Sequence, residues 1–299
     1  MTPMNKLQKL LEEKKVLVAD GGWETELIKK GLKTGDIPEA WNFSNHRLVK
    51  EVAKSYKDAG ADIILTNTFG ANKLKLHGTD VEQVNRIGVQ LSKEEAGQSL
   101  VFASIGPTGE FLEPSGDFEE AEFIDIYSKQ VKGIVDGGAD GIIIETMSDI
   151  KEALCALKAV RKNSSLPVGI TFGFNKDKKG FATIMGLTPE QAVLAVVKEN
   201  PDIIGANCGS VTIEDMVAIA KIMKKHTSIP LWIKPNAGLP VFKSGNTSYP
   251  QTPEEIAFFV PQLIEAGVKI IGGCCGTTPE HIKQIRKKVD QYFANSRRI

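Results

Sequence analysis

The sequence predicts a single (β/α)8 (TIM) barrel, and three observations support this fold class. Eight short apolar runs recur along the chain, each followed by a polar or Gly-rich turn and a segment with helical periodicity. The chain has 299 residues, near the ~250 that are typical of this fold. Polar residues gather at the ends of the runs, where such a barrel carries its ligand site. A doubly wound sheet is the alternative, but Asp20-Gly21-Gly22-Trp23 lacks its phosphate-binding fingerprint.

The eight predicted strands are almost continuously apolar, which is typical of a parallel sheet that is covered on both faces. They begin at Val16, Ala61, Leu100, Gly141, Pro167, Asp202, Pro230 and Val268.

Helices are expected between these strands. Residues 47–58 and 150–159 each place apolar side chains on one face. Asp149 and Glu152 predict a capping box for the second helix, and Thr252-Pro253 and Thr278-Pro279 predict two more helix starts. Residues 1–15 predict a helix before the first strand, and we expect residues 1–299 to form one domain.

Composition excludes several classes of protein. Lys plus Arg and Asp plus Glu both number 37, so the formal net charge is +0, which argues against binding to nucleic acid or to an anionic membrane. The charged N-terminal segment has no apolar core of a signal peptide, and no apolar run approaches the ~20 residues of a membrane helix. Four cysteines, two of them adjacent, make a poor disulfide framework. We therefore expect a cytoplasmic protein with reduced thiols.

Three of the four cysteines lie at strand ends. Cys208 ends the sixth run, and Cys274-Cys275 end the eighth. Adjacent side chains of a regular strand point to opposite faces, but the glycines at 272, 273 and 276 allow the backbone to leave that geometry. Three thiolates without a fourth Cys or His predict Zn²⁺ with an open coordination position. Cys155, on the apolar stripe of a helix, is expected to be a core residue.

An open position on a thiolate-rich metal favours binding of a substrate thiol, which the metal would deprotonate for attack on an activated carbon. A small amino-acid thiol also needs partners for its ammonium and carboxylate groups. Glu145 and Asp20 are the candidates for the ammonium group, and the backbone amides near Gly21, Gly22 and Ser104 are those for the carboxylate. The strand-end residue Asn207 is a further candidate substrate contact. A different possibility is that Lys234 forms a Schiff base, as in aldolases.

Seven motifs in order resemble the homocysteine S-methyltransferase family: ADGGWETEL, AGADIILTNTFGAN, ASIGPTG, GADGIIIETMSDIKEA, GANCGS, PNAGLP and GGCCGTTPEHI. The resemblance implies that Cys208, Cys274 and Cys275 bind zinc and that homocysteine sulfur takes the fourth position. It also implies that Glu145 holds the substrate amino group, with Asp20 nearby. PNAGLP, Tyr249 and TPEE look most like the homocysteine-binding module of cobalamin-dependent methionine synthase.

This resemblance predicts an enzyme of methionine biosynthesis, in which a methyl group moves onto the zinc-bound thiolate of homocysteine. Because the chain ends at Ile299, we expect the donor to be methylcobalamin on a separate corrinoid protein. The alternative donor is small: S-methylmethionine, a betaine or another methylated metabolite. Trp23 could stack on such a cationic donor, although packing is the favoured interpretation. A non-catalytic subunit that binds zinc or a thiol is the alternative outside the enzymes.

Overall fold

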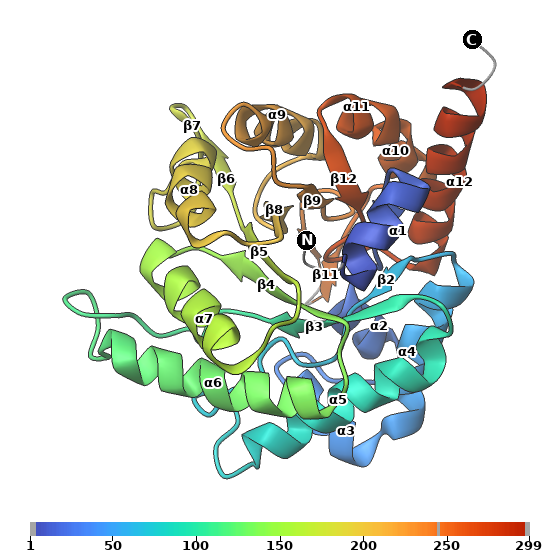
Figure 1. The fold of residues 1–299 in the computed structure, drawn as a ribbon. Helices are drawn as coiled ribbons and strands as arrows, with labels where there is room; N and C mark the ends of the chain where they lie inside the picture. Colours follow the sequence, from blue (N-terminus) through green and yellow to red (C-terminus); the bar gives the residue numbers. More distant parts are fainter. Residues whose placement is uncertain (1–3, 244–245, 297–299) are drawn as a thin grey trace.

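The computed structural model describes residues 4–243 and 246–296, and it shows a barrel of parallel strands surrounded by helices (Figure 1). The eight strands follow the order β1-β12-β9-β8-β5-β4-β3-β2, and a parallel bridge between Ala19 and Ile63 joins the first to the last. All eight predicted strands are confirmed: β1 (Leu17–Val18), β2 (Ile63–Ile64), β3 (Leu100–Ile105), β4 (Gly141–Met147), β5 (Val168–Phe172), β8 (Ile203–Asn207), β9 (Leu231–Lys234) and β12 (Val268–Ile271).

Helices follow the strands and cover the outside of the barrel, as the periodicity predicts. Their bounds are α2 (Trp23–Lys29), η1 (Pro38–Ala40), α3 (Trp41–Ser44), α4 (His46–Asp58), α5 (Val81–Ala96), α6 (Glu120–Asp136), α7 (Ile150–Asn163), α8 (Pro189–Val196), η2 (Val197–Glu199), α9 (Ile213–Lys224), α10 (Pro253–Phe258), α11 (Val260–Glu265) and α12 (Pro279–Ser296). No helix in the described part of the chain is long and apolar enough to cross a membrane.

The predicted capping box of α7 is wrong for Glu152, although Asp149 does cap the helix. The Asp149 side chain caps the helix by accepting a hydrogen bond from Lys151 N. Glu152 instead accepts hydrogen bonds from Thr108 N and from the hydroxyls of Thr108 and Tyr127. A buried carboxylate with three donors nearby is better satisfied there than at the solvent-facing cap.

The described residues form two main apolar cores and a small third cluster of Ala71, Leu76 and Val84. The larger one lies between the strands and the outer helices. The smaller one fills the barrel interior and includes Phe102, Ile143 and Trp232. The helix α1 (Lys6–Lys14) adds Leu7 to this interior core, so it covers the amino-terminal opening of the barrel (Figure 1).

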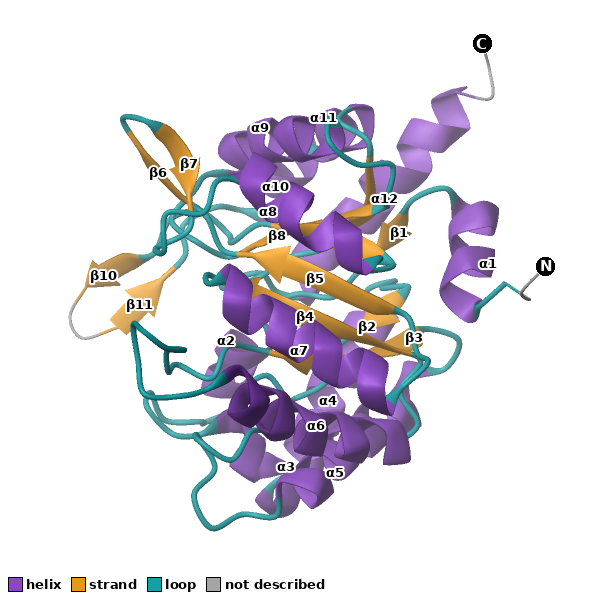
Figure 2. Ribbon diagram, turned by 60° about the vertical axis from the view of Figure 1, so that its left-hand side comes forward, coloured by secondary structure: helices purple, strands orange, loops and turns teal. Residues whose placement is uncertain are grey.

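Two short hairpins were not predicted. They are β6 (Asn175–Asp177) with β7 (Gly180–Ala182), and β10 (Val241–Lys243) with β11 (Asn246–Ser248). Figure 2 shows both on the side of the barrel toward which β5 points, opposite α1. They are therefore extensions of the loops at the carboxyl ends of the strands, where the predicted site residues also lie.

Candidate metal and thiol site

Polar side chains form a layer above the apolar interior of the barrel. Side chains of one strand face the interior at every second position. Phe102, Ile143 and Trp232 belong to the interior core, and the residues two positions later are Ser104, Glu145 and Lys234, all of them buried. Asn207 occupies the corresponding place at the end of β8. The alternation of the strands thus brings four polar groups together at the carboxyl end.

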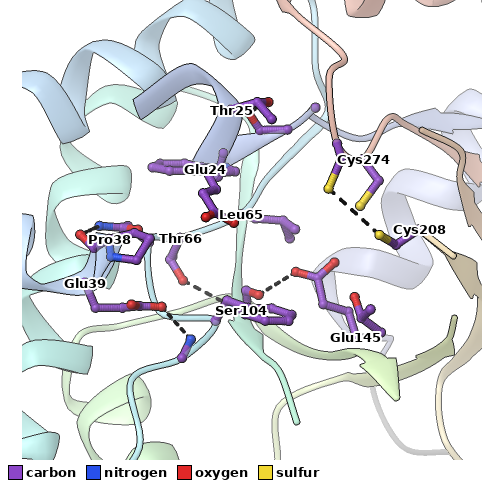
Figure 3. A pocket seen from close by; sticks show the side chains of 18 of the residues that line it. Glu24, Thr25, Pro38, Glu39, Leu65, Thr66, Ser104, Glu145, Cys208 and Cys274 are labelled. Carbon is purple, nitrogen blue, oxygen red and sulfur yellow. Dashed lines mark hydrogen bonds between the residues drawn. The ribbon is translucent and has the colours of Figure 1, made fainter. Parts of the chain in front are cut away.

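The three strand-end cysteines meet beside this layer. The sulfur atoms of Cys208, Cys274 and Cys275 all lie within 4.8 Å of one another, and Cys208 Sγ is 3.8 Å from Cys275 Sγ. The sulfurs of Cys208 and Cys274 lie on one side of a pocket, with Glu145 and Ser104 next to them (Figure 3). All four cysteines are free thiols.

The backbone turns sharply at Cys208, directly after β8. Cys208 has φ 56° and the following Gly209 has φ 76°, both in the left-handed region that a non-glycine residue adopts only at a cost. The Cys208 amide donates to the carbonyl of Lys234 on β9 at 3.2 Å. This turn takes the sulfur out of strand geometry and directs it toward the loop that follows β12.

The glycines around Cys274 and Cys275 act differently from the expectation. Gly272 and Gly273 precede the cysteines without left-handed backbone, but a Cβ on Gly273 would lie 2.2 Å from the hydroxyl oxygen of Thr277. They are therefore required by close packing of the loop. Only Gly276, with φ 78°, supplies the change in backbone direction that we expected of the glycines.

Asn236 connects the two sulfur-bearing loops, and the sequence assigned it no role. Its side-chain oxygen accepts from Cys275 N at 3.1 Å, and its side-chain nitrogen donates to the carbonyl of Gly209 at 3.0 Å. Tyr56 lies on the buried face of α4, and its hydroxyl donates to the carbonyls of Gly22 and Thr277. The only sequence signal for Asn236 was its place at a strand end within PNAG.

The geometry and charge of the three thiols fit Zn²⁺. Tetrahedral coordination with Zn–S bonds of about 2.3 Å separates the sulfurs by about 3.8 Å, which matches the distance between Cys208 and Cys275. Hydrogen bonds from Cys274 and Cys275 lower the pKa of Cys208, whereas hydrogen bonds to Cys208 raise the pKa of both neighbours. Three adjacent sulfurs can thus share one negative charge, and a bound cation is needed to deprotonate all three.

Glu145 and Ser104 form a buried pair next to the sulfurs. The Ser104 hydroxyl donates to Glu145 Oε1 at 2.5 Å. Burial raises the pKa of Glu145 to about 7, an effect that Cys274 and Asp20 reinforce and that Lys234 and the Ser104 hydrogen bond oppose. A ligand ammonium group near this carboxyl would favour its charged form.

Asp20 lies behind the pocket wall. One of its oxygens accepts from Trp23 Nε1 and from Leu65 N, both at 2.7 Å. The other forms an ion pair with Lys234 Nζ at 3.1 Å. Burial would lower the pKa of Lys234, but the charges of Asp20, Glu145 and Cys274 outweigh it and raise that pKa. A lysine held in its ammonium form is a poor nucleophile, so this geometry disfavours the Schiff-base hypothesis.

The side chain of Asn207 also makes its hydrogen bonds with neighbouring protein groups. Its side-chain oxygen accepts from Thr146 N and from the Thr171 hydroxyl, and its nitrogen lies 3.7 Å from Cys274 Sγ. Contacts of Asn207 and Asp20 with a substrate stay predictions, and the geometry places both residues in positions that support other site residues.

A cavity of about 560 Å³ opens above the polar layer. Seven of the nine predicted site residues line it, namely Gly21, Gly22, Ser104, Glu145, Cys208, Cys274 and Cys275. The cavity also extends away from the sulfurs to a region that the sequence did not indicate, where Figure 3 shows Glu24 and Glu39. Phe69 and Lys75 line the same cavity. Glu24 lies in the first turn of α2 and Glu39 in η1, whereas Phe69 and Lys75 come from the loop between β2 and α5.

Comparison with known proteins agrees with this geometry. A methionine synthase from Mycobacterium tuberculosis is 30% identical over 298 residues, which cover 92% of this chain and 25% of that protein. One from Mycobacterium leprae is 30% identical over 296 residues, covering 92% of this chain and 24% of that protein. The chain thus spans about a quarter of the length of these relatives.

Among solved structures, the metallated form of the homocysteine methyltransferase MmuM from Escherichia coli shares the fold, with a TM-score of 0.78 and 24% identity over 95% of this chain and 100% of that chain. The family model described as homocysteine S-methyltransferase matches residues 17–289. This match includes all eight barrel strands and the three converging cysteines. The chain therefore belongs to the homocysteine S-methyltransferase family.

Proposed function

We propose that the protein methylates the sulfur of homocysteine to form methionine, with Zn²⁺ held by Cys208, Cys274 and Cys275. The observation that carries this proposal is the convergence of three sulfurs next to the buried Glu145 at the open end of the barrel. When bound, Zn²⁺ would supply a Lewis acid that lowers the pKa of the substrate thiol.

The residues of the chain would bind and orient the substrate. Glu145, fixed by the Ser104 hydroxyl, is proposed to accept the substrate ammonium group. The substrate sulfur would then attack the methyl carbon, and the bond from that carbon to the donor would break with its electron pair left on the donor. Burial of the pocket wall limits competing reaction with water.

The donor is proposed to be a methylcorrinoid carried by a partner protein. The support is the 30% identity to methionine synthases. A small methylated donor is the second candidate, because Trp23 lines the same cavity as the three cysteines. Methionine formation measured with each donor in turn decides between them, and turnover with a small donor in the absence of any corrinoid would refute the first. Since the thiols must stay reduced, we propose that the protein works in the cytoplasm.

The zinc proposal is tested by changing each cysteine in turn. We expect Cys208→Ser, Cys274→Ser and Cys275→Ser to lose bound zinc and to lose methionine formation, because each removes one of three thiolate ligands. Cys155→Ser is the matched control, since Cys155 is buried in α7 away from the site. Zinc is counted by metal analysis of the purified proteins. A metal-free variant that methylates homocysteine at the unsubstituted rate would contradict the proposal, and tight homocysteine binding without turnover on any donor would favour an accessory subunit.

A further inference from the structure

We infer that hydrogen bonds to the three cysteine sulfurs direct methylation to the substrate, and that the Tyr249 hydroxyl gives this protection to Cys275. The inference rests on the proposed function, because it assumes three metal-bound thiolates and a methyl donor. A thiolate ligand is itself a nucleophile, so the donor could methylate a cysteine in place of the substrate. Such a side reaction would remove a metal ligand and inactivate the protein.

Tyr249 lies against the loop that carries Cys275. It directly follows β11, and a Cβ on Gly276 would lie 2.3 Å from the Cβ and Cγ atoms of its side chain. Glycine at 276 therefore allows the phenol to pack next to Cys275, and the Tyr249 hydroxyl hydrogen-bonds the sulfur of that residue. Since a metal-bound thiolate has no proton, the hydroxyl must be the donor in this contact.

Asn207 gives Cys274 a donor of the same kind. Its side-chain oxygen accepts from Thr146 N at 2.9 Å and from the Thr171 hydroxyl at 2.6 Å. These two donors fix the orientation of the amide group, because only its oxygen can accept from them. The amide nitrogen therefore faces the sulfur of Cys274, which lies 3.7 Å away.

Cys208 completes the set. The side chain of Asn236 and the backbone amide of Gly209 both hydrogen-bond its sulfur. Each of the three sulfurs thus has a hydrogen-bond donor that belongs to the protein. Hydrogen bonds of this type tune the reactivity of metal-bound thiolates, and the nucleophilicity of a thiolate falls as its basicity falls.

The donor side chains do not share the cavity with the sulfurs. All three cysteines line the cavity, whereas Asn207, Asn236 and Tyr249 are not among the described residues that do. A substrate sulfur that enters through the cavity would therefore approach from the side away from these donors. Without their hydrogen bonds it would be more nucleophilic than the cysteine sulfurs beside it.

The test measures where a small methyl donor reacts with the zinc-loaded protein. Iodomethane is added without homocysteine, and mass spectrometry of the peptides measures the rate of S-methylation at each cysteine. In this reaction a bond forms between the thiolate sulfur and the methyl carbon, and the carbon–iodine bond breaks with its electron pair left on iodide.

Tyr249→Phe keeps the aromatic ring and removes only the hydroxyl. It should raise the methylation rate at Cys275 by about 3- to 10-fold and leave the rates at Cys208 and Cys274 unchanged. This range follows because a hydrogen bond to a charged group changes basicity by roughly one to two pKa units, and nucleophilicity follows about half of that change.

Two controls accompany this variant. Tyr292→Phe, in α12 and edge-on to Phe293, should react as the unsubstituted protein does. Cys155 is buried in α7 and should stay unmethylated in every folded variant. When homocysteine is added, the unsubstituted protein should form methionine alone, whereas Tyr249→Phe should form methionine and also become methylated at Cys275.

Zinc content, measured before iodomethane is added, separates protection from loss of metal. A faster reaction at all three cysteines together with loss of zinc would mean that Tyr249 only holds the metal site together. Equal rates at Cys275 in Tyr249→Phe and in the unsubstituted protein would mean that the hydroxyl gives no protection. Either result would overturn the inference while the proposed function stands. If the unsubstituted protein binds no zinc, the proposed function fails and the inference fails with it.

Discussion

Asn236 shows how one side chain can set the distance between groups from two different strands. Its amide spans the loop after β8 and the loop after β12, because it donates to Gly209 and accepts from Cys275 N. It also hydrogen-bonds Cys208 and favours the thiolate form of that residue. Residues that support metal ligands in this way orient the ligands and tune their affinity.

We expect Asn236→Ala to weaken zinc binding by about 10- to 100-fold, the usual effect of losing such a supporting residue. Zinc affinity is measured by competition with a chromophoric chelator. Asn163→Ala is the control, because Asn163 also donates two side-chain hydrogen bonds but to Ser128 and Ala159. Equal zinc affinity in Asn236→Ala and the unsubstituted protein would show that the cysteine loops hold their positions without this bridge.

At the scale of single residues, the sequence predicts the positions that follow from the alternation of side chains along a strand. Ser104, Glu145 and Lys234 each come two residues after an interior apolar side chain, so their place in one layer follows from periodicity alone. The Asp20 carboxylate makes hydrogen bonds with Trp23 and Leu65 and an ion pair with Lys234. These contacts depend on the course of a loop and on a side-chain rotamer. Neither can be derived from the spacing of residues along the chain.

Helix α12 begins close to Cys274 and Cys275, the proposed zinc ligands, and a histidine forms hydrogen bonds at its first turn. His281 Nδ1 accepts from Thr278 N at 3.1 Å, and Nε2 donates to the carbonyl of Gln251 at 3.0 Å. Gln251 N in turn donates to Ala237, whose own amide donates to the carbonyl of Cys275. The neutral histidine thus joins the start of α12 to the loop that carries the sulfurs.

This contact predicts a pH dependence of stability. Burial and the charge of Lys29 lower the pKa of His281, against the opposing effects of the Gln251 carbonyl, Glu254 and Glu26. Below about pH 6.5 the unfolded chain therefore binds a proton that the folded chain does not. The free energy of unfolding is thus expected to decrease as the pH falls from that value toward the lower folded-state pKa.

His281→Gln should reduce this decrease, because Gln can accept from Thr278 N as Gln191 accepts from Thr188 N in α8 but does not titrate. Denaturant unfolding of both proteins in the same zinc state, between about pH 8 and 5, measures the difference. His77→Gln, in the loop before α5, is the control and should keep the unsubstituted pH dependence. Parallel curves for His281→Gln and the unsubstituted protein would refute the assignment.

Whole elements were predictable where one property repeats along them. The eight strands follow from their apolar runs, and Thr252 caps α10 with Glu255 as its sequence indicates. The hairpins β6–β7 and β10–β11 were not predictable, since their short strands are mostly exposed or only half-buried and carry no apolar pattern. The region around Glu39 was missed for a different reason, because its conformation depends on a hydrogen bond from the amide of Gly70, far away in the sequence, to the buried Glu39 side chain.

In the molecule as a whole, the candidate site and the apolar core that stabilises the barrel lie at different levels along the barrel axis. The polar layer and the sulfurs occupy the carboxyl end of the strands, whereas α1 covers the opposite end (Figure 2). Leu7 of α1 is 2% exposed and belongs to the same core as Leu17, Ile63 and Trp232, with Leu10 and Leu11 packed around it. Since this apolar interior lies directly below Glu145 and Lys234, it isolates the charged layer from solvent at the amino-terminal end.

Leu7→Ala should therefore destabilise the protein without altering the site. Loss of a buried leucine side chain costs about 2 to 5 kcal/mol, which is expected to lower the thermal midpoint of unfolding by several degrees. Zinc affinity and homocysteine binding, measured at a temperature where both proteins are folded, should stay unchanged because the cysteine loops make no contact with α1 through the described hydrogen bonds. Lys9→Ala, an exposed change in the same helix, is the control. A fall in zinc affinity without a fall in the thermal midpoint would mean that α1 acts on the site itself and not on the barrel that supports it.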